Sequence, residues 1–117
     1  MANYRRLKIE AATYFFTLVL NERKNTRVLT DNFHLIKFAL QKVKSKYPFK
    51  LIAMVVLPDH MHLIMALPNK DDDYSTRIRL IKTYFSKALG DNFTCSKSMQ
   101  GKSEKGVWQR RFWEHVI

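Results

Sequence analysis

The chain has 117 residues, and 21 Lys and Arg against 10 Asp and Glu give it a formal net charge of +11. This length allows one domain, residues 1–117, and 46% hydrophobic residues exclude disorder of the chain as a whole. No apolar run approaches the roughly 20 residues of a membrane span, no signal peptide is recognisable, and a single cysteine excludes an intramolecular disulfide, so we expect a cytoplasmic protein without membrane contact.

The first two expected elements are a strand and a helix. Residues 12–20 are rich in β-branched and aromatic types and contain neither Gly nor Pro, which is typical of a strand. Residues 21–27 read as a polar loop, and Thr30 or Asp31 could cap the helix that follows. Apolar residues then recur at helical spacing, and the helix must end before Pro48, which disfavours helical backbone at the preceding residue.

A hairpin of two strands is expected next. Residues 51–57 form a continuous apolar run, which predicts a strand buried on both faces. Pro58 and Asp59 predict a turn, and residues 60–67 predict a third strand. Because the connection is so short, the two strands must be antiparallel neighbours.

A second helix follows, with Asp73 or Ser75 as its N-cap and Gly90 at its C-terminal end. Its apolar stripe is expected to face the core. The basic side chains off this stripe are expected to face outward: Arg79, Lys82 and Lys87.

The last part of the chain predicts a mobile loop at 91–106 and a fourth strand at 107–117. Alternation along that strand would place Arg110 and Arg111 on opposite faces. The same strand carries two tryptophans, which we expect in the core, the alternative being stacking on nucleic-acid bases: Trp108 and Trp113.

The expected order of elements is β-α-β-β-α-β. This is the α+β, ferredoxin-like split βαβ arrangement, a four-stranded antiparallel sheet with both helices on one face. Because this fold hosts many functions, it does not identify one. The pI near 10.0 favours a polyanionic partner, such as a nucleic acid. The alternative is a basic surface that contacts only solvent.

Two histidines lie on the third expected strand with one residue between them. The side chains of His60 and His62 leave the same face, with Cα atoms about 6–7 Å apart. Such a pair could be hydrogen-bonded within the sheet, or it could hold a divalent cation. Structural zinc takes four ligands, whereas an incomplete ligand set suits a catalytic Mg²⁺ or Mn²⁺.

Several segments together resemble one family. A hydrophobic residue between two histidines on a central strand of this fold resembles the HUH motif of single-tyrosine transposases of the IS200-like superfamily. The rest is similar to the REP-associated tyrosine transposases, in segments spread along the chain: YRR at 4–6, ATYFFT at 12–17, LTD at 29–31, VVLPDHMH at 55–62, STR at 75–77, IK at 81–82, FS at 85–86 and WQRRFWEH at 108–115.

The resemblance implies metal-dependent endonuclease chemistry on single-stranded DNA. It implies that His60 and His62 hold Mg²⁺ or Mn²⁺, and that a tyrosine attacks the phosphate to leave a 5′-phosphotyrosine link. In the family this tyrosine lies on a helix after the fourth strand, so we expect it beyond Ile117. The chain is then a truncated transposase that is inactive by itself, or a natural short relative that binds DNA without cutting it.

The resemblance also implies REP-type hairpin DNA with a single-stranded flank as the partner. Five basic residues are candidate contacts to this DNA, the alternative for each being a solubilising charge: Arg5, Arg6, Lys82, Arg110 and Arg111.

Asp59 could orient an imidazole or simply stabilise its turn, and we favour the turn. His115 could lie near the histidine pair, although we do not expect it to be a ligand. The chain could be a monomer or a dimer. The alternative function is a non-catalytic ferredoxin-like module that binds single-stranded DNA or RNA.

Overall fold

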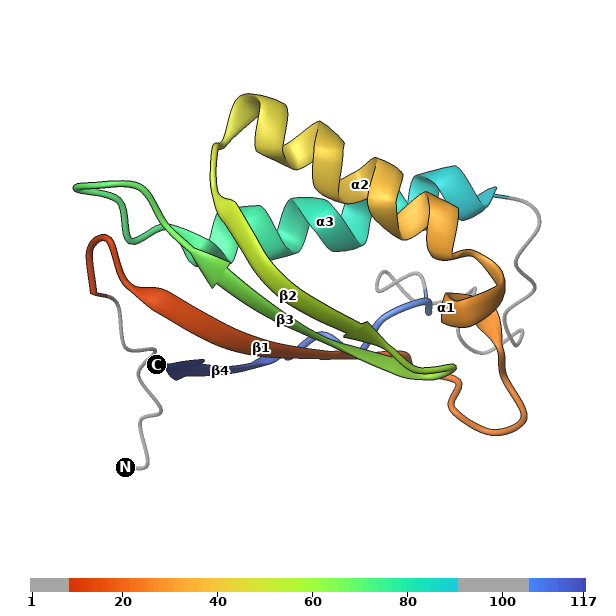
Figure 1. Cartoon of the computed structure of the whole chain (residues 1–117). Helices are drawn as coiled ribbons and strands as arrows, with labels where there is room; N and C mark the ends of the chain where they lie inside the picture. Colours follow the sequence, from red (N-terminus) through yellow and green to blue (C-terminus); the bar gives the residue numbers. More distant parts are fainter. Residues whose placement is uncertain (1–8, 91–105) are drawn as a thin grey trace.

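The computed structural model describes residues 9–90 and 106–117, and the predictions for residues 1–8 and 91–105, including Arg5, Arg6 and the loop, lie outside this part. The sheet has the strand order β2-β3-β1-β4 and is antiparallel throughout. Figure 1 shows the two long helices, α2 and α3, on one face of this sheet. The split βαβ arrangement is therefore confirmed. The elements in chain order are β1 Thr13–Val19, α1 Val28–Asp31, α2 Phe33–Lys46, β2 Lys50–Val56, β3 His60–Ala66, α3 Tyr74–Leu89 and β4 Trp113–Val116.

The core lies between the sheet and the two long helices. Side chains alternate along β1, so that Tyr14, Phe16 and Leu18 are fully buried against the helices. Their partners across the sheet are the buried apolar residues of β3, Met65, Leu63 and Met61. The helices contribute their buried stripes, Ile36, Ala39, Leu40 and Val43 from α2 and Ile78, Ile81, Phe85 and Leu89 from α3.

The start of α2 differs from the sequence-based expectation. Thr30 and Asp31 do not cap α2, because they belong to the short helix α1, whose Leu29 is buried in the core. Asn32 precedes α2 without a side-chain cap, and its Nδ2 instead donates to the Val28 carbonyl at 2.9 Å. A helix of four residues has too few positions to show a periodic pattern, which is why the sequence does not predict it.

The prediction that the 51–57 segment is buried on both faces is wrong. β2 is the edge strand of the sheet, and Ile52 and Val55 are 51% and 53% exposed. A register shift between Leu51 and Ala53 leaves Ile52 outside the regular pairing with β3. An apolar run does not specify how many layers cover a strand, and here the helices cover only one face.

The fourth strand is shorter than expected, because β4 contains only Trp113–Val116. Before it, Trp108 makes an isolated bridge to Leu20 and is buried beside Phe85, with ring centroids 5.5 Å apart. The expected burial is thus confirmed for Trp108 and wrong for Trp113, which is 55% exposed. Arg110 and Arg111 precede the strand, so the prediction that they occupy opposite faces of it is wrong as well.

The ends of α3 agree with the sequence. Asp73 Oδ1 accepts a hydrogen bond from the Thr76 amide at 3.1 Å, and Gly90 follows the helix at a φ of 54°, a backbone conformation that favours glycine. Arg79 and Lys87 are exposed as expected. Among residues 9–90 and 106–117, no helix is long and apolar enough to cross a bilayer.

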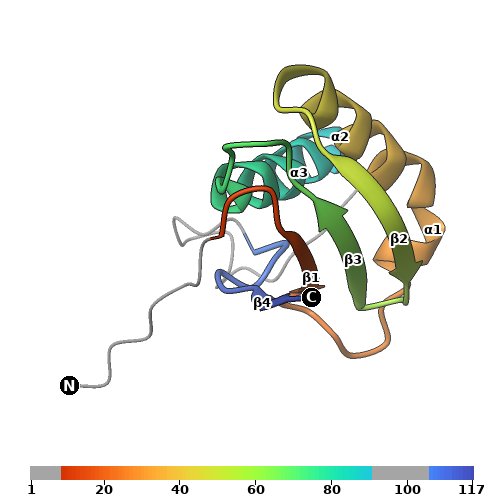
Figure 2. The same ribbon diagram turned by 60° about the vertical axis from the view of Figure 1, so that its left-hand side comes forward.

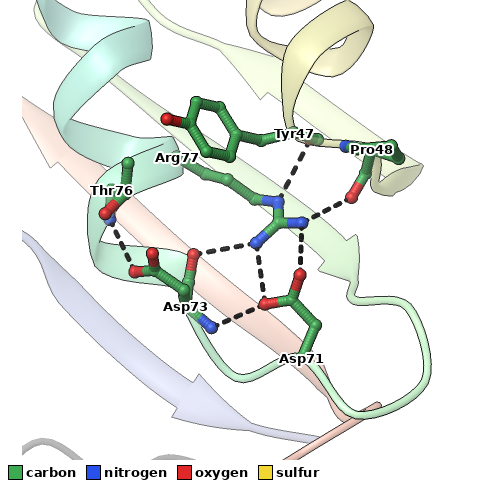
Figure 3. A network of polar contacts seen from close by, with 6 residues as sticks. All are labelled: Tyr47, Pro48, Asp71, Asp73, Thr76 and Arg77. Carbon is green, nitrogen blue, oxygen red and sulfur yellow. Dashed lines mark hydrogen bonds and ion pairs between the residues drawn. The ribbon is translucent and has the colours of Figure 1, made fainter.

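A buried arginine anchors the start of α3 to the end of α2 (Figure 3). Arg77 is only 1% exposed, and its guanidinium makes five hydrogen bonds. Two of them go to the Asp71 carboxylate, at 3.0 and 2.8 Å, and three go to backbone carbonyls of Tyr47, Pro48 and Asp73. The hydrogen bond from Arg77 and a further one from the Asp73 amide hold the pKa of Asp71 below its usual 3.8, although burial opposes this.

Candidate metal and DNA site

His60 and His62 lie on the face of the sheet opposite the long helices, which in Figure 2 is the lower face. Their cross-strand partners on β1 are Val19 and Thr17. Residues directly opposite one another in an antiparallel pair point to the same face, so β1 and β3 place these side chains together. The intervening Met61 points into the core and is buried.

The ring orientation of His60 follows from an ionised carboxylate beside it. Asp59 Oδ1 lies 2.7 Å from His60 Nδ1, and Asp59 Oδ2 accepts from Arg23 Nε at 2.7 Å. The hydrogen bond to His60, and then that from Arg23, holds the pKa of Asp59 below its usual 3.8, so the carboxylate can only accept. His60 Nδ1 therefore donates to Asp59, which leaves Nε2 for a ligand. We favoured a role for Asp59 in stabilising the turn alone, and this was wrong, because Asp59 also contacts the imidazole of His60.

The ring of His62 is held from two sides. Its Nδ1 lies 3.0 Å from Thr17 Oγ1 on β1. The Phe15 ring stacks on the imidazole, with centroids 5.2 Å apart and planes at 19°. With Nδ1 engaged by the hydroxyl, Nε2 is again the nitrogen that remains for a ligand.

These two rings form a donor pair that fits a divalent cation. Their centroids are 5.1 Å apart, with planes at 80°. Within residues 9–90 and 106–117, neither Nε2 has a hydrogen-bond partner, and no cluster of three or more His, Cys, Asp or Glu could hold a metal. The donor set is thus incomplete in the described part of the chain, which matches the open coordination of a catalytic ion and not a structural zinc site.

The predicted basic contacts to DNA lie on α3 and in the segment before β4. Lys82 is half-buried and does not point freely outward as expected: its Nζ donates to the Gln109 carbonyl at 2.8 Å and lies 5.7 Å from the centre of the Phe112 ring. Lys82 therefore anchors the segment that leads into β4. Arg110 and Arg111 are exposed in that same segment. Their contacts to DNA, like that of Lys82, stay predictions.

Sequence reasoning missed the partners of the histidines and the aromatic character of the open face. Thr17 lies 45 residues from His62, and Arg23 lies 36 residues from Asp59, so only the strand pairing brings them together. On the open face, the Thr17↔Trp113 and Phe15↔His115 pairs continue the same rows across β1 to β4. The alternation W-x-H at the end of the chain was the available signal for this face.

Comparison with known proteins agrees with this fold. The family model described as "Transposase IS200 like" matches residues 8–116. The REP-associated tyrosine transposase of Escherichia coli is 43% identical over 117 residues, which is 100% of this chain and 62% of that protein. The Haemophilus influenzae protein described as "Putative REP-associated tyrosine transposase" is 43% identical over 118 residues. The match covers 100% of this chain and 66% of that protein.

A solved structure extends the comparison. The structure of a REP-associated tyrosine transposase bound to a REP hairpin is 42% identical, with a TM-score of 0.82, and the match covers 100% of this chain and 62% of that one. The chain thus spans 62–66% of the length of these relatives, less than two thirds. The family model covers nearly all of the chain and places it in the class of transposases. The chain belongs to the IS200-like transposase family, and its resemblance to the REP-associated branch is confirmed.

Proposed function

We propose that the chain forms the metal- and DNA-binding part of a transposase that cuts single-stranded DNA at REP-type hairpins. The observation that carries this proposal is the pair of His60 and His62, each with its Nδ1 engaged by a neighbouring side chain, which leaves Nε2 for a ligand. A divalent ion held by this pair has a role in cutting DNA, whereas passive binding of DNA does not need one.

The chain's own residues prepare this reaction. When bound, Mg²⁺ or Mn²⁺ would neutralise the charge that builds on the scissile phosphate. Asp59 and Thr17 keep the two imidazoles in the orientation that binds it. In the proposed step a tyrosine hydroxyl gives up its proton as its oxygen bonds to phosphorus, the bond from phosphorus to the 3′ oxygen breaks, and this oxygen takes up a proton to become the 3′-hydroxyl, so that no net proton is released.

The attacking tyrosine is not one of the four that the structure describes. Tyr14 and Tyr74 are fully buried on the helix side of the sheet. Tyr47 and Tyr84 pack against the same core, away from the histidine face. The fifth tyrosine, Tyr4, lies outside the described residues. We therefore propose that cleavage requires a tyrosine other than these four.

The DNA substrate is tested by binding measurements. We expect the chain to bind a single-stranded oligonucleotide with a REP-type hairpin more tightly than one of equal composition that cannot fold. Because released counterions drive binding to phosphates, the logarithm of the affinity should fall linearly with the logarithm of the salt concentration, by about 0.7 per phosphate contact on single strands. Fluorescence anisotropy over a range of salt concentrations measures both effects.

Matched variants localise the contacts. Replacing Arg110 and Arg111 with Ala should weaken binding and reduce the salt slope by about 0.7 for each phosphate that is no longer neutralised. The control replaces Lys37 and Lys44, which line a groove of about 320 Å³ between α2 and β2 at the other edge of the sheet. Equal affinity for both oligonucleotides together with a flat salt slope would contradict the proposed substrate.

The role of the hydrogen bond between Asp59 and His60 can be tested separately from DNA binding. Asp59→Asn should weaken Mn²⁺ binding about 10-fold or more, because the His60 ring loses the ionised acceptor that keeps its proton on Nδ1. Mn²⁺ titration measures the affinity, and nitrogen NMR of the metal-free protein should show a change in the His60 tautomer. Glu22→Gln, an exposed carboxylate beside Arg23, is the control. An unaltered tautomer would remove Asp59 from this role.

A non-catalytic module that binds single-stranded nucleic acid is the second candidate function. The observation that favours it is the exposed aromatic surface of the sheet, a feature by which related folds bind RNA. The two functions differ in their need for metal, so Mn²⁺ binding that depends on His60 separates them.

A further inference from the structure

Trp113 is the large aromatic side chain that the sheet exposes most within the described part of the chain. It is 55% exposed, whereas the other tryptophan of the sequence, Trp108, is 6% exposed. Exposing an indole on a regular strand costs free energy in water, because its apolar surface stays hydrated. Trp113 lies on the edge strand β4, on the same face as the candidate metal site, so its ring is available for contact with another molecule there.

The place of Trp113 in the sheet connects it with the candidate metal site. Trp113 pairs with Thr17, and Thr17 pairs with His62, so the three side chains form one row on the open face. Neighbouring strands are about 4.8 Å apart, which puts Trp113 roughly 10 Å from His62 across the sheet. A single DNA strand can therefore contact both.

The next row on this face is also aromatic. Phe15 pairs with Ile64 on one side and with His115 on the other. The Phe15 ring is engaged with His62, and its centroid lies 6.4 Å from that of the exposed His115. Trp113 and His115 thus both lie on the open face, next to the Phe15 ring that stacks on the candidate ligand His62.

From this arrangement we infer that Trp113 is a stacking platform for an unpaired base of the DNA strand whose phosphate lies at His60 and His62. The inference rests on the proposed function and adds to it a contact with a base. Aromatic rings stack on any unpaired base, whereas the bases of a duplex are already stacked on one another. The net charge of +11 and the continuity with the histidine pair favour a nucleic-acid strand over a protein as the occupant.

The affinity for a DNA strand tests this inference. The probe is an oligonucleotide with a REP-type hairpin and an unpaired flank of about 10 nucleotides, within the span of known single-strand sites. Trp113→Ala should weaken binding about 5- to 150-fold, and Trp113→Phe should restore most of it, because a phenyl ring still stacks. Ile52→Ala is the matched control, since Ile52 is 51% exposed on the edge strand β2. A flank of abasic sugar phosphates should abolish the difference between wild type and Trp113→Ala.

Fluorescence gives a second readout on the same samples. The spectrum of Trp113→Phe contains Trp108 alone, so its subtraction from the wild-type spectrum isolates Trp113. We expect the flanked oligonucleotide to quench the Trp113 emission and to leave that of Trp108 unchanged.

The outcomes separate the two proposals. Wild-type affinity in Trp113→Ala with the hairpin still bound overturns the stacking contact and leaves the proposed function standing. No binding of any oligonucleotide by the wild type overturns both. A change of Trp113→Ala from dimer to monomer at unaltered DNA affinity would make this face an interface between copies of the chain, and would overturn the stacking contact.

Discussion

Asp71→Asn is expected to lower the free energy of unfolding by about 3 kcal/mol. The substitution leaves the guanidinium of Arg77, which is 1% exposed, without the charge that compensates it. The value is at the lower end of the usual range for a broken buried pair, because the Asp71 side chain is 30% exposed. Urea unfolding followed by circular dichroism measures the change.

The control for this prediction is Asp72→Asn, one residue along the same loop, which should change the stability by no more than about 0.5 kcal/mol. Acidity supplies a further check. The pKa of Asp71 is held below 3.8, so its contribution is present in full above pH 3.8 and is lost as the pH falls toward the lower folded-state pKa. The stability difference between wild type and Asp71→Asn should therefore narrow in acid. A constant difference down to that range would show that the ion pair is not its source.

His60→Ala and His62→Ala should each weaken the binding of Mn²⁺ by about 100-fold or more. Each removes one of the two imidazoles whose Nδ1 is already engaged, and the effect of a missing ligand exceeds the 10- to 100-fold effect typical of residues that only support ligands. Electron paramagnetic resonance of free Mn²⁺ during a titration measures the affinity. Because both side chains lie on the open face, the variants should keep the fold.

His115→Ala and His34→Ala are the controls, and neither should alter Mn²⁺ affinity strongly. His115 lies on the same face but in the row of Phe15, and His34 is exposed on α2. If His115→Ala weakened the affinity as much as His60→Ala, then His115 would be a third ligand. Full Mn²⁺ affinity in His60→Ala or His62→Ala would remove that histidine from the metal site.

The sequence predicted the parts of this fold that depend on local periodicity. Alternation along β3 and the caps of α3 are local patterns, and the structure confirms them. The prediction that β2 is buried on both faces was wrong, because the position of a strand within a sheet depends on all the other strands. The same apolar run would be covered on both faces in a central strand between two layers of helices.

The sequence predicted the two candidate ligand histidines of the site, but not the residues that hold their rings in place. His60 and His62 share a face by the period of a strand, which the sequence shows directly. Thr17 and Arg23 reach the pair across other elements, so no spacing in the sequence indicates them. The exposure of Trp113 depended on where β4 begins, and strand boundaries are the least certain part of any interpretation from sequence.

Alternate residues of β1 have two different roles, because they lie on opposite faces of the sheet. Tyr14, Phe16 and Leu18 stabilise the core, whereas Phe15 and Thr17 orient the His62 ring on the other face. Substitutions at the first set are felt as a decrease in folding free energy, and those at the second as altered ring geometry. The chemistry of this sheet can therefore be re-engineered residue by residue along β1 without disturbing the packing that keeps the strand in place.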